Sequence, residues 1–227
     1  KIPDREPQIV MMFPGQGAQY PGMGRSLYEG EPVVKQHLDA CFDAIAGQVP
    51  FDLRERMFSG AAADLAQTAV TQPATFALEY ALANWWISRG LAPQILVGHS
   101  IGEFVAATLA GSLGLEEAIR LVAQRGVLMQ ALPAGAMLSV RMSSDALSPF
   151  LSEDVQLAAE NGPAACVAAG PEASIDALAR ALEAQGHASR RLQTSHAFHS
   201  SMMDPAVPTF ADMVRNVALA PPRLRIV

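Results

Sequence analysis

The chain has 227 residues, of which 50% are hydrophobic, and a formal net charge of −6 at pH 7. Its length allows a sizeable core, in one large domain or in one domain with an insert. The acidic balance argues against nucleic acid as a partner, and no apolar stretch approaches the roughly 20 residues of a membrane-spanning helix. Cys41 and Cys166 stand in unrelated contexts. We therefore expect reduced thiols in a cytoplasmic protein, without a disulfide or a metal site.

The first part of the chain has the pattern of an α/β domain. Residues 1–8 are polar, contain two prolines and are expected to form an interdomain linker. The continuous apolar run 9–13 predicts a strand buried on both faces, and apolar side chains at helical spacing predict a helix over 32–46. This alternation, continued below, is typical of a mostly parallel sheet with helices around it.

A second, longer helix is predicted to begin at Thr71 or Gln72 and to end at Gly90. Pro73 then falls in its first turn, where proline is tolerated because that N–H has no helical partner. The next expected elements are a strand over 95–97 and helices over 103–109 and 115–132.

The order of elements changes after Pro133. Residues 134–194 have the order strand, helix, two strands, helix, strand, which is the ferredoxin-like βαββαβ pattern. Such a segment fits a small subdomain inserted into a larger one, which would comprise residues 9–133 and 195–227. The expected elements here are strands over 136–141, 155–159, 166–169 and 190–193, helices over 144–151, 175–185 and 207–216, and a final strand within 221–227.

The pentapeptide Gly98-His99-Ser100-Ile101-Gly102 follows the strand over 95–97 directly. It matches the G-x-S-x-G turn that presents a nucleophilic serine between a strand and a helix. The small flanking glycines allow a tight turn, and the serine lies at the positive end of the following helix. A surface-turn serine is the alternative, but the strand and helix around it favour a covalent acyl-enzyme on Ser100.

A serine nucleophile needs a base, and the chain has five histidines. His37 and His187 lie on polar stretches, which favours solvated positions. His99 precedes the serine and points to the other side of the chain, as a packing residue or as one that supports the site from behind. His196 and His199 lie where the chain returns from the insert, so they are the candidates, with capping or core-edge histidines as the alternative.

Arg125 falls on the apolar arc of the helix predicted over 115–132, with Leu121, Val122, Leu128 and Met129 at helical spacing around it. No acid on its own helix can pair with it. A buried guanidinium keeps its proton and requires an anion. The anion is either an acid elsewhere in the fold or a substrate carboxylate gripped in bidentate fashion.

The first predicted strand ends in a loop that contains Gly15-Gln16-Gly17. Such a turn can aim a backbone N–H at the site, as a second oxyanion donor beside the N–H of Ile101. A simple strand-to-loop turn is the alternative.

Together these residues resemble the malonyl-CoA:acyl carrier protein transacylase family, and in particular the acyltransferase domains of modular polyketide synthases. The resemblance covers nearly the whole chain and implies an α/β-hydrolase-like large subdomain with a ferredoxin-like insert. The matching motifs, in order, are Phe-Pro-Gly-Gln-Gly-Ala-Gln (13–19), Thr-Gln-Pro-Ala (71–74), Gly-His-Ser-Ile-Gly-Glu (98–103), Arg125 and His-Ala-Phe-His-Ser (196–200).

The resemblance implies roles for these positions. Ser100 would be the nucleophile and His199 the base, the backbone amides of Gln16 and Ile101 would form the oxyanion hole, and Arg125 would bind the malonyl carboxylate. The other implied substrate-binding residues are Gln72, His196 and Phe198.

In this family His-Ala-Phe-His accompanies malonyl and Tyr-Ala-Ser-His accompanies methylmalonyl. Phe198 would fill the space that the α-methyl group of methylmalonyl needs. Ile101, directly after the serine, also favours a preference for malonyl. A methyl group is worth only about 1–3 kcal/mol of discrimination, so we expect the preference for malonyl over methylmalonyl to be incomplete.

The resemblance further implies malonyl-CoA as substrate, no bound cofactor, and an acyl carrier protein with its phosphopantetheine arm as partner, beside a neighbouring ketosynthase domain in a multidomain synthase. The family continues beyond Val227 and there supplies a carbonyl that orients the histidine, so the chain is expected to be truncated at its C-terminus.

Two other functions are compatible with a serine elbow: a serine thioesterase or hydrolase, and a catalytically silent docking domain. A hydrolase would carry an acid between serine and histidine at the end of a later strand. The acids available there outside the insert, Glu103, Glu116 and Glu117, lie instead on helices close after the elbow. This placement weakens the hydrolase alternative.

Overall fold

The structure is a computed structural model that describes residues 8–227. The chain divides into two compact units, the first comprising residues up to Val127 together with Asp212–Val227, and the second Leu128–Ala211. The sequence predicted these divisions at 133/134 and 194/195, so the inserted unit begins earlier and ends later than expected. The predicted linker falls almost wholly outside the described residues.

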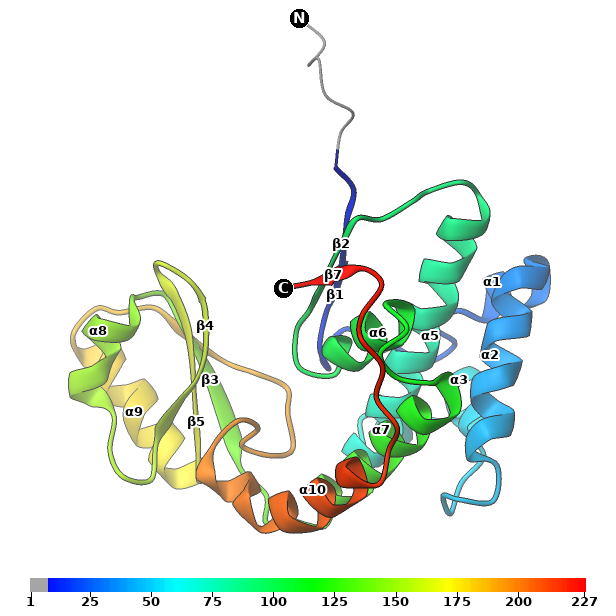
Figure 1. Ribbon diagram of the computed structural model, residues 1–227. Coiled ribbons are helices and arrows are strands. Elements are labelled where there is room, and N and C mark those ends of the chain that lie inside the picture. The colour runs from blue at the N-terminus through cyan, green and yellow to red at the C-terminus, as the bar shows by residue number, and fades with distance from the viewer. Residues whose placement is uncertain (1–7) are drawn as a thin grey trace, which may run out of the picture. The chain divides into compact units, whose positions relative to one another are not determined.

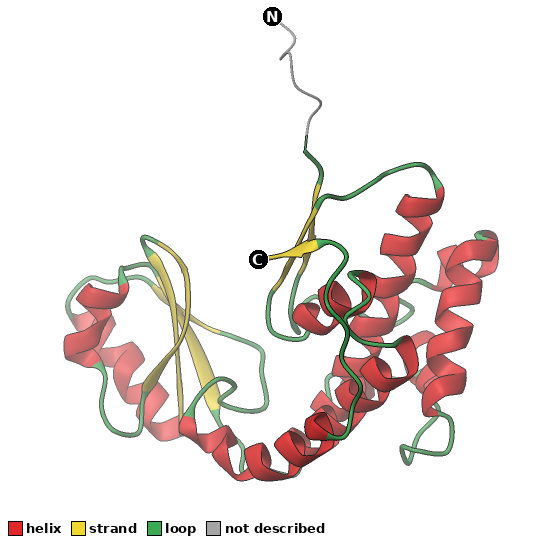
Figure 2. Cartoon of the chain, viewed as in Figure 1, coloured by secondary structure: helices red, strands yellow, loops and turns green. Residues whose placement is uncertain are grey.

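Unit 1 is built around a parallel sheet in the order β1-β2-β7, formed by β1 (Val10–Phe13), β2 (Ile95–Gly98) and β7 (Arg225–Ile226). The register pairs Phe13 with Gly98, so β1 and β2 end side by side. Figures 1 and 2 show the helices of this unit gathered on one side of these strands. The helices of the first part of the chain are α1 (Arg25–Gly30), α2 (Pro32–Ile45), α3 (Leu53–Phe58), α4 (Ala62–Leu65), α5 (Thr68–Ser88), α6 (Gly102–Leu109) and α7 (Leu115–Gln130).

The long helix α5 begins earlier than its sequence pattern predicted. Its first helical residue is Thr68, so Pro73 lies inside the helix rather than in the first turn. A proline there removes one helical hydrogen bond. The segment from Thr68 to Ala74 is buried throughout. The free energy gained by burying this segment outweighs the unfavourable helix propensity of Pro73.

Three short helices, α1, α3 and α4, were not predicted. Helix α3 carries a recognisable signal, because the Asp52 side chain caps it by accepting a hydrogen bond from the backbone N–H of Glu55 at 3.0 Å. Helices of four to six residues show too few turns for a hydrophobic period, so caps are the only local indication of them.

Unit 2 has the predicted ferredoxin-like arrangement. Its antiparallel sheet has the order β4-β5-β3-β6, in which β5 lies between β3 and β4. Helix α9 packs against one face of this sheet through Ile175, Leu178 and Leu182. The elements are β3 (Ala136–Val140), α8 (Ser144–Leu147), η1 (Ser148–Phe150), β4 (Gln156–Gly162), β5 (Ala165–Gly170), α9 (Glu172–Ala184), β6 (Ser189–Arg191) and η2 (Ser201–Ala206), followed by α10 (Val207–Arg215), which leads back into unit 1.

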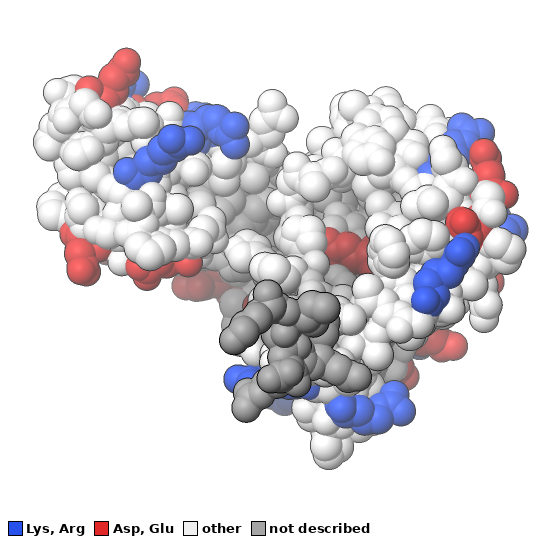
Figure 3. All heavy atoms as spheres, turned by 90° about the horizontal axis from the view of Figure 1, so that it is seen from above, with Lys and Arg blue, Asp and Glu red and all other residues white. Residues whose placement is uncertain are grey.

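Charged side chains form small separate groups on the face shown in Figure 3 rather than one extended basic field. No helix among residues 8–227 is long and apolar enough to cross a membrane. Cys41 and Cys166 are both buried and free of a disulfide, and burial raises the pKa of the Cys41 thiol to about 12. A thiol that resists ionisation in this way is a packing group rather than a nucleophile.

Candidate active site

Ser100 lies in a strained turn between β2 and α6. Its φ is 56°, a left-handed value that is uncommon for a residue with a side chain. The backbone crowds closely around it: a Cβ at Gly102 would lie 2.2 Å from the Phe13 carbonyl oxygen, and one at Gly98 would lie 2.3 Å from the Glu103 nitrogen. Glycine is therefore required on both sides of the serine, and the sharp turn has the geometry of a nucleophile elbow.

The first turn of α6 leaves one backbone donor available beside this serine. The N–H groups of Gly102, Glu103 and Phe104 donate to carbonyls of the three residues from His99 to Ile101. Within residues 8–227 the N–H of Ile101 meets no acceptor. An amide at a helix N-terminus next to a nucleophile can stabilise an oxyanion.

The loop after β1 lies against the same turn. A Cβ at Gly15 would lie 3.5 Å from Ser100 Cβ and 3.0 Å from the Nδ1 atom of His99. Gln16 and Gly17 form a turn at this point, and the N–H of Gln16 meets no acceptor among the described residues. Both predicted oxyanion donors therefore belong to segments that adjoin Ser100.

Arg125 is half-buried on α7, and its partner is neutral. The Nη1 atom of Arg125 donates to Oε1 of Gln72 at 2.8 Å, and Gln72 is only 2% exposed. Burial lowers the pKa of the Arg125 guanidinium, while the charge of Glu103 acts in the opposite direction. No ion pair within 4 Å includes Arg125 in the described part of the chain. A buried cation held by an amide can still receive an anion.

His199 belongs to unit 2 and shares the backbone strain of Ser100. Its φ is 60°, and among the described residues only these two combine a side chain with a positive φ. His199 is exposed and follows Phe198 in a turn just before η2. Strained positions in a structure often mark functional residues, so this turn supports a functional reading of His199.

His196 is buried in unit 2, and both ring nitrogens have partners. Its Nε2 lies 3.1 Å from the Leu132 carbonyl oxygen and its Nδ1 lies 2.7 Å from Ser195 Oγ. A carbonyl can only accept, so Nε2 carries a proton, and Nδ1 shares a hydrogen bond with the Ser195 hydroxyl. This arrangement favours a structural role for His196.

Phe198 packs inside unit 2, in a cluster that includes Met129, Met137 and Val167. Its ring is therefore part of the packing that supports the turn at His199.

The expectation for His37 and His187 needs correction, because neither is fully solvated. The ring of His37 meets Tyr80 edge-on at 5.4 Å, and that of His187 meets Phe150 at 6.0 Å. Their polar neighbours in sequence concealed these contacts with aromatic rings on other elements.

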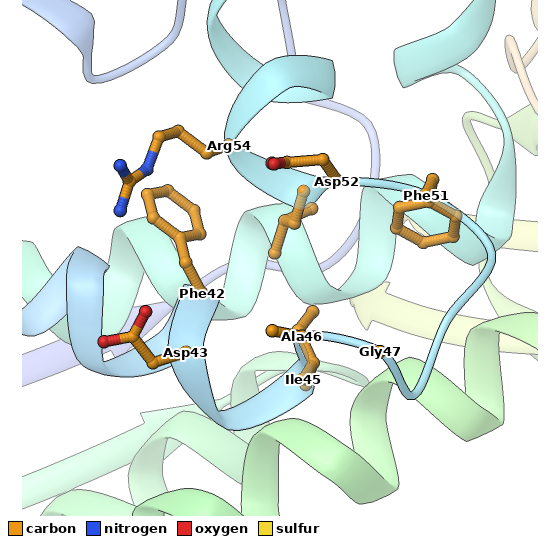
Figure 4. Close-up of a pocket in the computed structure, with 9 residues that line it drawn as sticks. Phe42, Asp43, Ile45, Ala46, Gly47, Phe51, Asp52 and Arg54 are labelled. Atoms are coloured by element: carbon orange, nitrogen blue, oxygen red, sulfur yellow. The ribbon is translucent and has the colours of Figure 1, made fainter.

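Two pockets on the surface lie apart from the predicted site residues. One, of about 330 Å³, lies between the end of α2 and the start of α3 and is lined by side chains that include Phe42, Phe51 and Arg54 (Figure 4). The other, of about 390 Å³, is lined by residues of α9 and β6 and includes Asp176 and Arg191. None of the predicted site residues lines either pocket.

Glu103 has no predicted role in the site, although its charge opposes the lowering of the Arg125 pKa by burial. Its position one turn after Ser100 was the available signal, because the first turn of α6 and the Ser100 turn form one structure. Within unit 1, Ser100, the two amide donors and the Arg125–Gln72 pair thus belong to contiguous packed elements.

The comparisons with known proteins identify the family of the chain. The model of the acyl transferase domain matches residues 10–227. A phenolphthiocerol/phthiocerol polyketide synthase of Mycobacterium tuberculosis (strain CDC 1551 / Oshkosh) is 42% identical over 216 residues, which are 95% of this chain and 14% of that protein. The chain therefore spans a small part of that curated relative.

Two solved structures are also similar. The acyltransferase domain from the second module of the salinomycin polyketide synthase has a TM-score of 0.94 and 42% identity, covering 100% of this chain and 54% of that one. A complex of a malonyl-transacylase with a type II polyketide synthase acyl-carrier protein, PlMCAT:AntF, has a TM-score of 0.87 and 30% identity, covering 97% of this chain and 74% of that one.

A strained serine elbow on a parallel sheet, with a ferredoxin-like insert, defines an acyltransferase fold, and the chain belongs to the acyl transferase domain family. Within that family it is similar to the acyltransferase domains of modular polyketide synthases.

Proposed function

We propose that the chain transfers a malonyl group from malonyl-CoA, through an ester on Ser100, to the phosphopantetheine thiol of an acyl carrier protein during polyketide synthesis. The observation that carries this proposal is the left-handed Ser100 turn, with φ of 56° between β2 and α6. That strain is maintained at a cost in folding free energy, and it presents a hydroxyl beside two amide donors.

The preference for a malonyl group rests on Arg125. A guanidinium that is half-buried and bound to a neutral amide is a receptor for a carboxylate. Malonyl-CoA carries a carboxylate on the acyl group, whereas acetyl-CoA does not. Gln72 holds the guanidinium without neutralising it, which gives this buried residue a role in substrate binding.

The reaction has two half-reactions. His199 takes the proton of Ser100, whose Oγ attacks the thioester carbonyl, and the N–H groups of Gln16 and Ile101 stabilise the oxyanion. The intermediate collapses as His199 returns the proton to the leaving thiolate of CoA. In the second half-reaction the carrier thiol gives its proton to His199 and attacks the malonyl ester, and His199 passes that proton to the departing Oγ, which regenerates the Ser100 hydroxyl.

The preference for malonyl over methylmalonyl follows from the resemblance of residues 196–199 to the malonyl-type motif. The burial of Phe198 and the hydrogen bonds of His196 indicate that this motif acts through the packing of the loop that carries His199. The carrier protein as partner is supported by the solved malonyl-transacylase complex, and a place in a larger synthase, beside a ketosynthase as the resemblance implies, by the polyketide synthase relative.

Mass spectrometry of the intact protein tests the proposal. Incubation with an equimolar mixture of malonyl-CoA and methylmalonyl-CoA should give an adduct on Ser100 that is mainly malonyl, and Ser100→Ala should give none. A catalytically silent domain would remain unmodified. An adduct that is mainly methylmalonyl would remove the specificity part of the proposal and leave the acyltransferase part intact.

A thioesterase or hydrolase is the second candidate, because an elbow serine with a histidine base also serves hydrolysis. The two functions differ in the lifetime of the ester. Stable malonyl-Ser100 that is discharged by a carrier protein thiol supports transfer, whereas rapid release of free malonate without any carrier supports hydrolysis.

A further inference from the structure

The loop that carries His199 is closed by a neighbouring side chain. Phe198 and His199 are the central residues of a turn between Ala197 and Ser200. The hydroxyl of Ser200 donates to the Ala197 carbonyl oxygen at 2.6 Å and so bridges the two ends of that turn. The bond spans the residue whose φ is 60°.

The same hydroxyl also connects the turn to the helix that follows. Ser200 is the N-cap of η2, and its Oγ accepts a hydrogen bond from the Met202 N–H at 3.3 Å. The Met203 N–H donates to the Ser200 carbonyl at 2.9 Å. One side chain thus uses its donor towards the turn and its acceptor towards the helix.

A positive φ in a residue with a side chain costs about 1–3 kcal/mol and persists only where surrounding contacts enforce it. The second central position of such a turn normally favours glycine or asparagine. His199 is held there between a buried residue, Phe198, and the Ser200 bridge.

We propose that Ser200 is a positioning residue that fixes the left-handed backbone of His199, and thereby the direction in which its imidazole projects. The proposal rests on the proposed role of His199 as the base. Ser200 does not touch the reacting atoms in this proposal. Its hydroxyl acts through the backbone, by removing the alternative conformations in which the imidazole would point elsewhere.

Single-turnover acylation by malonyl-CoA tests this in the intact protein. Ser200→Ala removes donor and acceptor, and we expect it to lower the acylation rate about tenfold to hundredfold, with the KM for malonyl-CoA unchanged. Ser200→Thr keeps both functions and should restore a rate close to that of the wild type. The adjacent Ser201→Ala is the matched control and should behave as the wild type, because the hydrogen bond from Ser201 to Gln156 is made by its backbone N–H.

A direct measure of the backbone accompanies the kinetics. The NMR chemical shifts of the His199 backbone should change in Ser200→Ala and stay in place in Ser200→Thr and Ser201→Ala. If Ser200→Ala does not fold, Ser200→Gly replaces it, because glycine is tolerated at an N-cap at a small cost in stability.

The outcomes separate this proposal from the proposed function. If His199→Ala acylates at the wild-type rate, the base assignment is wrong. If His199→Ala is inactive while folded Ser200→Ala acylates within about twofold of the wild type, or Ser200→Thr fails to restore the rate, the positioning role is wrong and the base assignment stands.

Discussion

The Nη1 atom of Arg125 donates to Oε1 of Gln72 at 2.8 Å, and this contact joins α7 to α5 across the interior of unit 1. Gln72 offers an oxygen without a charge, so the guanidinium is fixed in direction while its partner leaves its charge unneutralised. Burial lowers the pKa of the Arg125 guanidinium, and the charge of Glu103 acts in the opposite direction.

Arg125→Ala should lower kcat/KM for malonyl transfer by an amount equivalent to about 2–4 kcal/mol of lost transition-state stabilisation. The reason is that a hydrogen bond between charged groups is lost and the substrate carboxylate is left unpaired. Acetyl transfer should change less. The measurement is kcat/KM for both acyl groups. Arg120→Ala is the matched control on the same helix, since Arg120 is exposed and pairs with Glu116 at 3.4 Å. Equal losses for malonyl and acetyl would contradict the assignment of Arg125 to the carboxylate.

Gln72→Glu should raise the KM for malonyl-CoA by about tenfold or more, because the new carboxylate would pair with Arg125 and compete with the substrate. The folded protein should be at least as stable as the wild type, as measured by thermal unfolding. Gln124→Glu adds the same charge on α7, where the wild-type side chain donates to the Gln48 carbonyl, and serves as the control. An unchanged KM in Gln72→Glu would show that malonyl does not reach this guanidinium.

Gly102→Ala should destabilise the protein by about 1–3 kcal/mol and abolish acylation of Ser100, because the added Cβ would lie 2.2 Å from the Phe13 carbonyl oxygen. Either β1 or the start of α6 must then shift. Gly30→Ala, at the end of α1, meets nothing within 4 Å and should leave both stability and acylation close to wild type. Denaturant unfolding and adduct formation measure the two effects. Normal acylation in Gly102→Ala would show that the elbow tolerates displacement.

Glu79 on α5 should make stability depend on pH. Burial raises the pKa of its carboxyl to about 8, and its Oε2 atom is buried without a hydrogen-bond partner among the described residues. Because the pKa is higher in the folded state than in the unfolded state, the folded state binds the proton more tightly. Stability is therefore greatest below the unfolded value near 4.5 and falls as the pH rises towards 8.

Glu79→Gln should remove that decrease and raise the free energy of unfolding at pH 8 by about 1–3 kcal/mol, the scale of an unsatisfied buried group. Denaturant unfolding between pH 5 and pH 8 provides the measurement, because this range lies between the pKa of Glu79 in the unfolded state and its pKa in the folded state. Two parallel curves for the wild type and the variant would show that the pKa of Glu79 is not raised in the folded protein.

The order of elements followed from short-range pattern, and so did the Ser100 elbow and the position of Arg125 on an apolar helix face. Strand β2 and helix α6 begin and end within a residue of the predicted bounds, because an apolar run and flanking glycines are local signals. The ferredoxin-like order of unit 2 is equally local, since it depends only on the sequence of strands and helices. The short helices α1, α3 and α4 were not predicted, because each has too few residues to show a helical period of apolar side chains.

The amino-acid sequence by itself determined the chemistry that the chain offers: a serine in a glycine-flanked turn, histidines after the insert, and an arginine with no acid on its helix. Only the tertiary structure decided how those groups are held. Gln72 lies 53 positions from Arg125, and Pro73 is helical because its turn is buried. Such pairings depend on which distant surfaces pack together, and no local rule of spacing or propensity encodes that choice.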